Sequence, residues 1–163
     1  MYAKLNDEFH IGGQIKKAFE ESGHSVEWLA EKIDCKRRNI YDIFTRTSFD
    51  TAQLMSISVA LKTNFFIHFS EICENKIDKT KNTTPMIWPK DEFCIGALIK
   101  SKLNAEKLKT SWLAKKIRLQ RDSVYKKFDR PSIDTTLLLL ICEALNTNFF
   151  EYFCGLYEAA VSG

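Results

Sequence analysis

Basic, amide and hydroxyl side chains gather in two short stretches of this chain, residues 36–41 and 120–126. Arginine and lysine donate hydrogen bonds to phosphate oxygens and to guanine, and asparagine and glutamine pair with adenine. Serine and tyrosine hydroxyls bind phosphate oxygens as well. This chemistry is that of contacts with DNA. The candidate binding residues are Lys36, Arg37, Arg38, Asn39, Tyr41, Gln120, Arg121, Ser123, Tyr125 and Lys126.

The net charge of +3 conceals an uneven distribution. Residues 32–46 contain five basic side chains and two acidic ones, and residues 115–130 contain seven and two. Positive charge concentrated on one element is typical of a protein that binds a polyanion. A solvent-exposed helix face gives the same pattern, so charge alone leaves both interpretations open.

Both stretches belong to an internal repeat. With an offset of 84 residues, segment 7–69 aligns with segment 91–153 without a gap, and 28 of the 63 positions are identical. This period exceeds the ~20–50 residues of solenoid repeats, so each copy is expected to be a small domain. The predicted organisation is a first domain over 1–74, a linker over 75–90 and a second domain over 91–163.

The composition supports two packed domains. Apolar residues make up 45% of the 163 residues and aromatic residues 12%, which is enough for cores in domains of roughly 60–70 residues. The longest apolar run, residues 137–142, is far shorter than the about 20 residues that span a membrane, and no signal-peptide stretch opens the chain. We therefore expect a cytoplasmic protein without membrane association.

Cysteine and histidine do not indicate a metal site. The five cysteines show no C-x-x-C spacing, none aligns with a cysteine of the other copy, and the chain has only three histidines. This pattern favours reduced thiols over zinc ligands or disulfides. The chain also lacks a glycine-rich phosphate loop, a nucleophile–histidine constellation and a convergent carboxylate pair. No metal, cofactor or enzymatic activity is therefore expected.

The spacing of apolar residues predicts helices throughout each copy. In the first copy, Ile11 begins a stripe that recurs every four residues. Ser25, then Ser48 or Asp50, and finally Asn64 can cap the helices that follow. Five short helices and no strand are expected in each copy, so the predicted fold class is all-α with two tandem five-helix domains.

The second and third helices of each copy must cross steeply around a tight turn, which lies at residues 34–36 in the first copy. Ala30 and Ala114 supply the small residue that this crossing needs. Apolar side chains fill the inward positions, which leaves the candidate binding residues on the outer face of the third helix. The inward residues are Leu29, Ile33, Cys35, Ile40, Ile43, Leu113, Ile117, Leu119 and Val124.

With these features each copy resembles the lambda-repressor/Cro-like helix-turn-helix domain, the XRE family of bacterial and phage regulators. The resemblance covers about residues 9–70 and 93–154. It depends on the segments SVEWLAEKIDCKRRNIYDIF and TSWLAKKIRLQRDSVYKKF and on the S-x-D-T…I…AL helix that follows each. The resemblance implies a third helix that enters the major groove of double-stranded DNA. The implied function is a sequence-specific transcriptional regulator with two DNA-binding domains in one chain.

The chain departs from this family at several positions. The usual glycine of the turn is Asp34 in the first copy and Arg118 in the second, and a left-handed backbone suits aspartate better than arginine. Val26 occupies a position where a polar residue often meets a phosphate. Lys127 replaces the inward Ile43 of the first copy. We therefore expect a distorted turn in the second copy.

Some of these side chains also fit a purely structural role. Arg38 and Asp42 are four residues apart and can pair on the helix surface. Tyr41 and Tyr125 suit either the edge of the core or a phosphate contact. The aromatic residues expected to pack rather than to bind are Trp28, Trp112, Phe65, Phe66, Phe149 and Phe150.

Two arrangements of the copies remain open. The apolar stretch Met86-Ile87-Trp88 is expected to lie against a domain and to set the orientation of the copies. An intrachain pseudo-dimer then presents two unlike third helices, about 34–36 Å apart, to an asymmetric DNA site. In a homodimer, one copy binds DNA and the other supplies the interface. The alternative function is a protein-interaction module, antitoxin-like or accessory, on the same scaffold.

Overall fold

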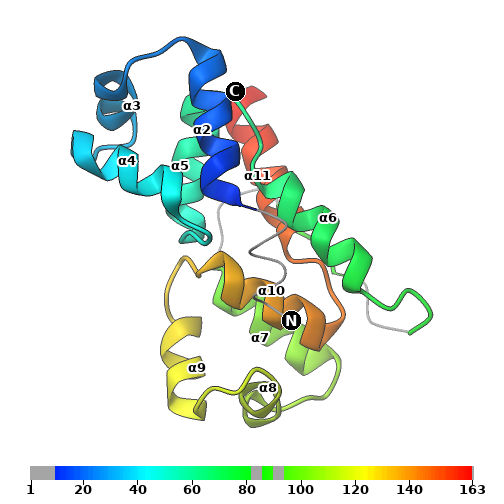
Figure 1. The fold of residues 1–163 in the computed structure, drawn as a ribbon. Helices are drawn as coiled ribbons and strands as arrows, with labels where there is room; N and C mark the ends of the chain where they lie inside the picture. The colour runs from blue at the N-terminus through cyan, green and yellow to red at the C-terminus, as the bar shows by residue number, and fades with distance from the viewer. Residues whose placement is uncertain (1–9, 82–85, 90–93, 163) are drawn as a thin grey trace.

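The computed structural model of this protein describes residues 10–81, 86–89 and 94–162. These residues form ten helices and no strand beyond an isolated bridge, which confirms the all-α fold class (Figure 1). The helices of the first copy are α2 (Ile11–Ser22), α3 (Val26–Lys32), α4 (Arg37–Thr45), α5 (Thr51–Leu61) and α6 (Phe66–Lys76). Those of the second are α7 (Ile95–Ala105), α8 (Thr110–Lys116), α9 (Arg121–Phe128), α10 (Thr135–Leu145) and α11 (Phe150–Ser162).

Polar side chains cap the first turns of several helices, among them those expected from the sequence. Each helix of the second copy begins 84 residues after its counterpart in the first. Ser25 accepts a hydrogen bond from an α3 amide at 3.1 Å, and Asp50 accepts one from an α5 amide at 2.9 Å. Asn64 accepts one from the first amide of α6 at 3.0 Å. The expected caps are thus present, while the predicted domain boundary at residue 74 falls inside α6.

The turn between the second and third helices has the same geometry in both copies. Asp34 and Arg118 both adopt the left-handed conformation, with φ of 53° and 58°. The next amide donates to the carbonyl of Ala30 or Ala114 at 2.9 Å in each case. The expected distortion of the second turn is therefore wrong. This closing hydrogen bond and the packing around it offset the about 1–2 kcal/mol that a left-handed backbone costs arginine.

Two glycines let the first helix of each copy approach the end of the third. A Cβ atom on Gly12 would lie 2.6 Å from the carbonyl oxygens of Ile43 and Arg46, and one on Gly96 would overlap the carbonyl of Phe128. These close approaches help to position α4 and α9. Sequence reasoning did not identify this role, because a glycine within a helix carries no sign of what packs against it.

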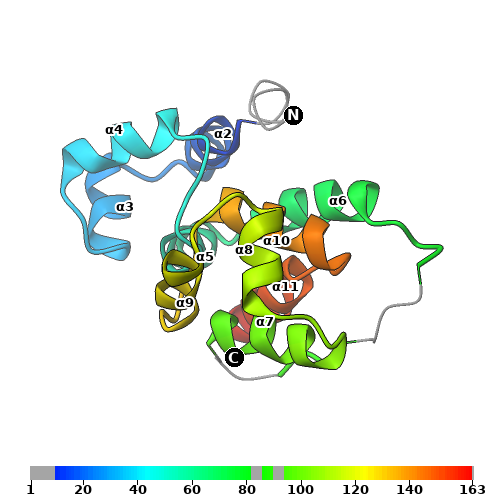
Figure 2. The same ribbon diagram turned by 90° about the horizontal axis from the view of Figure 1, so that it is seen from below.

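The fifth helices pack against the opposite copy. The closest backbone approaches of α6 are to α10 and α11, and α11 also lies against α5. Figures 1 and 2 show α11 beside α5 in one half of the molecule and α6 beside α10 in the other. The first four helices of each copy are therefore completed by the last helix of the other, so packing units and sequence copies differ at this helix.

Equivalent backbone groups of the two copies meet at a central seam. The Thr51 amide donates to the Ile133 carbonyl, and the Thr135 amide donates to the Phe49 carbonyl, both at 2.8 Å. Each threonine hydroxyl in turn accepts a hydrogen bond from an amide of the other copy, at 3.0 and 3.1 Å. The 84-residue offset converts each contact into its partner, as in the isologous interface of a symmetric dimer. The two copies thus meet at a pseudo-symmetric seam within one chain.

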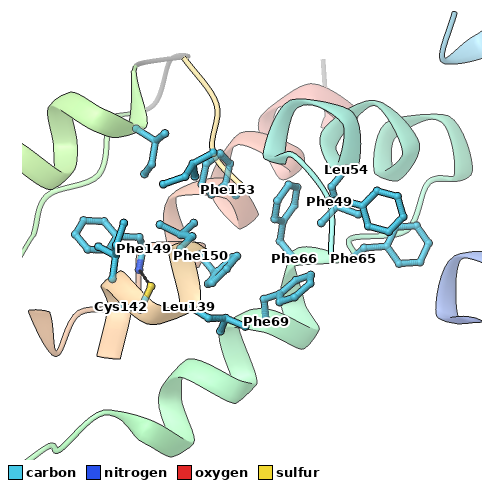
Figure 3. Packing of buried hydrophobic residues seen from close by; sticks show 14 of the residues in the cluster. Phe49, Leu54, Phe65, Phe66, Phe69, Leu139, Cys142, Phe149, Phe150 and Phe153 are labelled. Carbon is cyan, nitrogen blue, oxygen red and sulfur yellow. Dashed lines mark hydrogen bonds between the residues drawn. The ribbon is translucent and has the colours of Figure 1, made fainter. Parts of the chain in front are cut away.

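Aromatic rings extend this seam between α6 and α11 (Figure 3). Phe66 stacks on Phe153 and Phe69 stacks on Phe150, with 5.1 Å between the ring centroids in each pair. None of the four is more than 6% exposed, and such a pair contributes about 0.5–1.5 kcal/mol beyond the area it buries. The expected burial of Phe65, Phe66, Phe149 and Phe150 is confirmed, since none is more than 1% exposed, and the core that they build is shared by both copies.

Part of the segment that joins the copies lies against the second one. Trp88 donates to a carboxylate oxygen of Glu151 at 3.1 Å, and its ring meets that of Phe149 edge-on at 5.7 Å. Met86 also packs against the core, whereas Ile87 is 92% exposed. The expected docking of this stretch is therefore confirmed for Met86 and Trp88 and wrong for Ile87. Met86 and Trp88 thus face the core, whereas the side chain between them faces solvent.

Candidate nucleic-acid interface

The ten predicted binding residues all lie on α4 and α9 or directly before them. Lys36 and Gln120 precede the helices in an extended conformation. Eight of the ten are exposed, and the equivalent pair Asn39 and Ser123 is half-buried. The structure therefore brings these residues together as two surfaces, one on each copy.

Buried residues on the opposite side of each helix determine which side chains face solvent. Ile40 and Ile43 of α4 are fully buried, and Val124 and Phe128 of α9 are at most 2% exposed. The predicted inward residues of the preceding helices behave likewise, although Ile33, Cys35 and Leu119 are only half-buried. Helical periodicity then turns the basic residues outward.

A tyrosine one turn along each helix contacts the first arginine. Tyr41 and Tyr125 are 50% and 42% exposed, so both belong to the surface rather than to the edge of the core. A hydrogen bond to Tyr41, followed by the charge of Glu27, raises the pKa of Arg37 above its ordinary value. In the second copy, the Arg121 guanidinium lies 5.7 Å from the centre of the Tyr125 ring. Each arginine is thus held at the start of its helix.

In the first copy, an acidic residue forms an ion pair with this arginine and offsets its charge. The Nε of Arg37 lies 3.1 Å from a carboxylate oxygen of Glu27, and both side chains are more than 60% exposed. Among the described residues, no such ion pair joins Arg38 to Asp42, the pairing that their spacing allowed as an alternative to DNA contacts. An exposed pair of this kind stabilises a fold by only about 0–1 kcal/mol. Its larger consequence is that Glu27 neutralises part of the positive charge at the start of α4.

The second copy has a basic hollow at the equivalent place. Ser111 stands where the first copy has Glu27, and Asn104 stands where it has Glu20. The hollow adjoins α9, and none of the described residues that line it is acidic. Its lining residues are Lys100, Leu103, Asn104, Leu108, Lys109, Thr110, Ser111, Arg121 and Tyr125.

Several residues of this hollow were not identified from the sequence. Lys100, Lys109 and Ser111 lie outside the third helix, and the predicted site was confined to that helix and the residue before it. A comparison of charge between aligned positions could have identified this hollow, because two acidic residues of the first copy are replaced by neutral ones in the second. Lys100 also lies 3.7 Å from a carboxylate oxygen of Asp129, so it is partly neutralised.

The two basic helices lie toward the same side of the molecule. Figures 1 and 2 both show α4 and α9 at the side that carries the connections into α5 and α10, where the seam begins. The segment that follows α6 lies at the opposite side in both views.

The tryptophans of the second helices pack beside these surfaces. Trp28 and Trp112 are half-buried against the core, as expected. Lys32 and Lys116 each place an ammonium group 5.8 Å from the centre of the tryptophan ring. Trp28 alone is also stacked on an imidazole ring, that of His24, at 3.5 Å and 7° between the ring planes. The two copies therefore share a packed indole but differ in what covers it.

Comparison with known proteins adds no assignment. Scans of family models, curated proteins and solved structures found no match to this chain. Within the described ranges, no helix is long and apolar enough to cross a membrane. In the same part of the chain, no three His, Cys, Asp or Glu side chains are grouped to hold a metal ion.

Proposed function

We propose that this protein is a sequence-specific DNA-binding transcriptional regulator whose helices α4 and α9 enter the major groove. The supporting observation is the pair of equivalent helices, which lie toward one side of the molecule in Figures 1 and 2 and each of which has exposed arginine, lysine and tyrosine side chains. An α-helix fits the major groove, and these residue types bind phosphates and base edges. The proposal treats each copy as a lambda-repressor-like, XRE-family helix-turn-helix domain in a cytoplasmic protein.

The proposal also assigns both reading helices to one chain. Homodimeric regulators place two identical helices on DNA through an isologous interface. Here the two copies make contacts of that kind within a single chain, through Thr51 with Ile133 and Thr135 with Phe49. The reading faces differ, with KRRN at 36–39 and QRDS at 120–123. An intrachain pseudo-dimer should therefore bind an asymmetric site with two unlike half-sites.

Selection of bound sequences from random double-stranded DNA, followed by footprinting of the full chain, tests this proposal. We expect one asymmetric site whose half-sites are centred about 34–36 Å apart, one helical turn of DNA. A perfect palindrome would contradict the pseudo-dimer and favour a homodimer in which one copy binds. Failure to select any sequence would contradict the regulator itself.

The double variant Arg37→Ala with Arg121→Ala tests the proposed surface. Loss of two phosphate contacts should weaken binding and reduce the slope of log K against log salt by about two units. Its circular dichroism should match that of the parent, because both side chains are exposed. The matched control is Lys79→Ala with Lys81→Ala, which removes two exposed charges after α6. Equal losses in the two double variants would indicate nonspecific attraction.

A protein-interaction module remains the second candidate function. The observation that favours it is an open groove on the first copy that is lined by Trp28 and Val59 and lies apart from α4. Val59 is a large apolar residue that is 38% exposed. Under this alternative the protein would bind a partner protein and would retard no DNA, which the same selection experiment would reveal.

A further inference from the structure

The first copy carries an open groove between α3 and α5, with a volume of about 800 Å³. Its floor includes Met55 and Val59 of α5. The stacked rings of His24 and Trp28 form one wall. We call this region the α3/α5 groove. An apolar floor beside a flat aromatic wall suits an apolar side chain of a ligand.

Two lysines give this groove a positive charge. Lys32 lies beside the Trp28 ring, and Lys62 lines the groove at the end of α5. Both are exposed, and none of the described residues that line the groove is acidic. Lys62 adopts the left-handed conformation, with φ of 53°. The groove therefore combines apolar contact with attraction for a carboxylate.

The second copy shows what the equivalent region binds. Asn146, the counterpart of Lys62, also has a left-handed backbone, with φ of 50°. Its side chain accepts a hydrogen bond from the Asp78 amide at 2.7 Å and donates one to the Asp78 carbonyl at 2.9 Å. Lys81, which follows in the same segment, lines the hollow beside Trp112. The segment after α6 thus lies along the edge of the groove between α8 and α10.

The two grooves differ at the positions that would select a ligand. Asn146 has a donor and an acceptor, which match the two groups of a peptide backbone, whereas Lys62 only donates. Glu143 lines the groove of the second copy, and the apolar Val59 replaces it in the first. The first groove should therefore favour an acidic and more apolar occupant.

From this internal precedent we propose that the α3/α5 groove binds an extended segment of a partner protein in which acidic and apolar side chains alternate. In an extended segment, successive side chains point to opposite sides. The apolar side of the segment would contact Trp28 and Val59, and carboxylates on its other side would meet the exposed ammonium group of Lys62. This inference goes beyond the proposed regulation of DNA and does not depend on it, because the groove includes no residue of α4 or α9.

Titration of the full chain with blocked peptides, followed by the tryptophan indole N–H signals in NMR spectra, tests this proposal. The probes are a peptide that alternates aspartate with leucine and its counterpart with lysine in place of aspartate. We expect the Trp28 signal to shift with the acidic peptide and to shift little with the basic one. The Trp112 signal should stay in place, so the second copy serves as an internal control.

Two substitutions that give the first groove the residues of the second make the test more specific. Val59→Glu and Lys62→Asn should each weaken binding of the acidic peptide about threefold, through like-charge repulsion or loss of an exposed ion pair. Both positions are exposed, and asparagine tolerates the left-handed backbone, so the fold should persist. Both variants should keep the DNA affinity of the parent, which separates this proposal from the proposed function.

Three outcomes would overturn the proposal. One is a Trp28 signal that does not respond to the acidic peptide at millimolar concentration. Another is an equal response to both peptides or at both Trp28 and Trp112. The last is a Trp28 shift caused by a single-stranded oligonucleotide and not by the peptide, which would assign the groove to nucleic acid.

Discussion

The third helices of the two copies share a scaffold but differ in the charge around their first arginine. In the first copy, Glu27 lies 3.1 Å from Arg37 and compensates it. In the second, Ser111 replaces that acid, and Lys109 joins Arg121 in a basic hollow. The total charge of α4 and α9 does not reveal this difference, because Glu27 and Ser111 lie in the preceding helices, α3 and α8.

This contrast separates residues that packing constrains from residues that it does not. Ala30 and Ala114 are both nearly buried, and each accepts the hydrogen bond that closes its turn, so a change there would alter the helix crossing. Glu27 and Ser111 are exposed, and either residue is compatible with the fold. A duplicated scaffold can therefore keep its geometry while its two surfaces acquire different electrostatics.

The largest expected effect concerns the glycines that position the third helices. Gly96→Ala should lower the free energy of unfolding by about 3 kcal/mol and Gly12→Ala by about 1–3 kcal/mol, because an added Cβ meets backbone carbonyls. Gly96 should be the more sensitive, since its Cβ would overlap Phe128 more deeply. Urea unfolding followed by circular dichroism measures both values.

Gly155→Ala is the matched control for this prediction. It lies within α11, and a Cβ there would meet no atom within 4 Å. Alanine should stabilise the helix by about 0.5–1 kcal/mol. Equal effects of the three substitutions would show that close approach does not position α4 and α9.

The next largest effect compares the two arginines in DNA binding. Arg121→Ala should weaken binding to the selected site about tenfold, whereas Arg37→Ala should weaken it less, since Glu27 already offsets part of its charge. Fluorescence anisotropy with labelled duplex at several salt concentrations measures both. A larger loss for Arg37→Ala would reverse the proposed ranking of the copies.

A smaller effect on DNA affinity is expected when Glu27 and Ser111 are exchanged between the copies. Glu27→Ser should strengthen DNA binding by about threefold, and Ser111→Glu should weaken it by a similar factor, as expected for an exposed ion pair. The same anisotropy titrations report both changes, and the difference should shrink at high salt. Effects of the same sign in both variants would exclude a simple electrostatic origin.

The smallest effect concerns the turn. Arg118→Gly should raise the free energy of unfolding by about 0.5 kcal/mol, and Asp34→Gly should change it less, because aspartate tolerates φ near +53° better than arginine tolerates +58°. Denaturant titration of the two variants provides the comparison. Destabilisation by Arg118→Gly would mean that its side chain has a structural role.

Much of each copy could be predicted from residues that lie close together in the sequence. Ser25 and Asp50 cap helices by accepting hydrogen bonds from amides two or three residues away, so a short stretch of sequence is enough to predict the cap. Helical periodicity likewise predicted the burial of Ile40 and the exposure of Arg37. The prediction that Ile87 packs against a domain was wrong, because its side chain faces solvent between two neighbours that face the core. The function proposed from these residues stays a prediction.

By itself the sequence determined the all-α class, the repeat and the basic face of each third helix, because capping and amphipathic spacing act over a few residues. The tertiary structure decided how the copies combine. Thr51 meets Ile133, and Phe66 meets Phe153, across more than 80 residues of chain. The identity of a threonine or a phenylalanine does not specify a distant partner, since burial and hydrogen bonding can be satisfied within one copy or between two. Only the packed structure shows that the last helices pack against the opposite copies and that the two copies meet at a pseudo-symmetric seam.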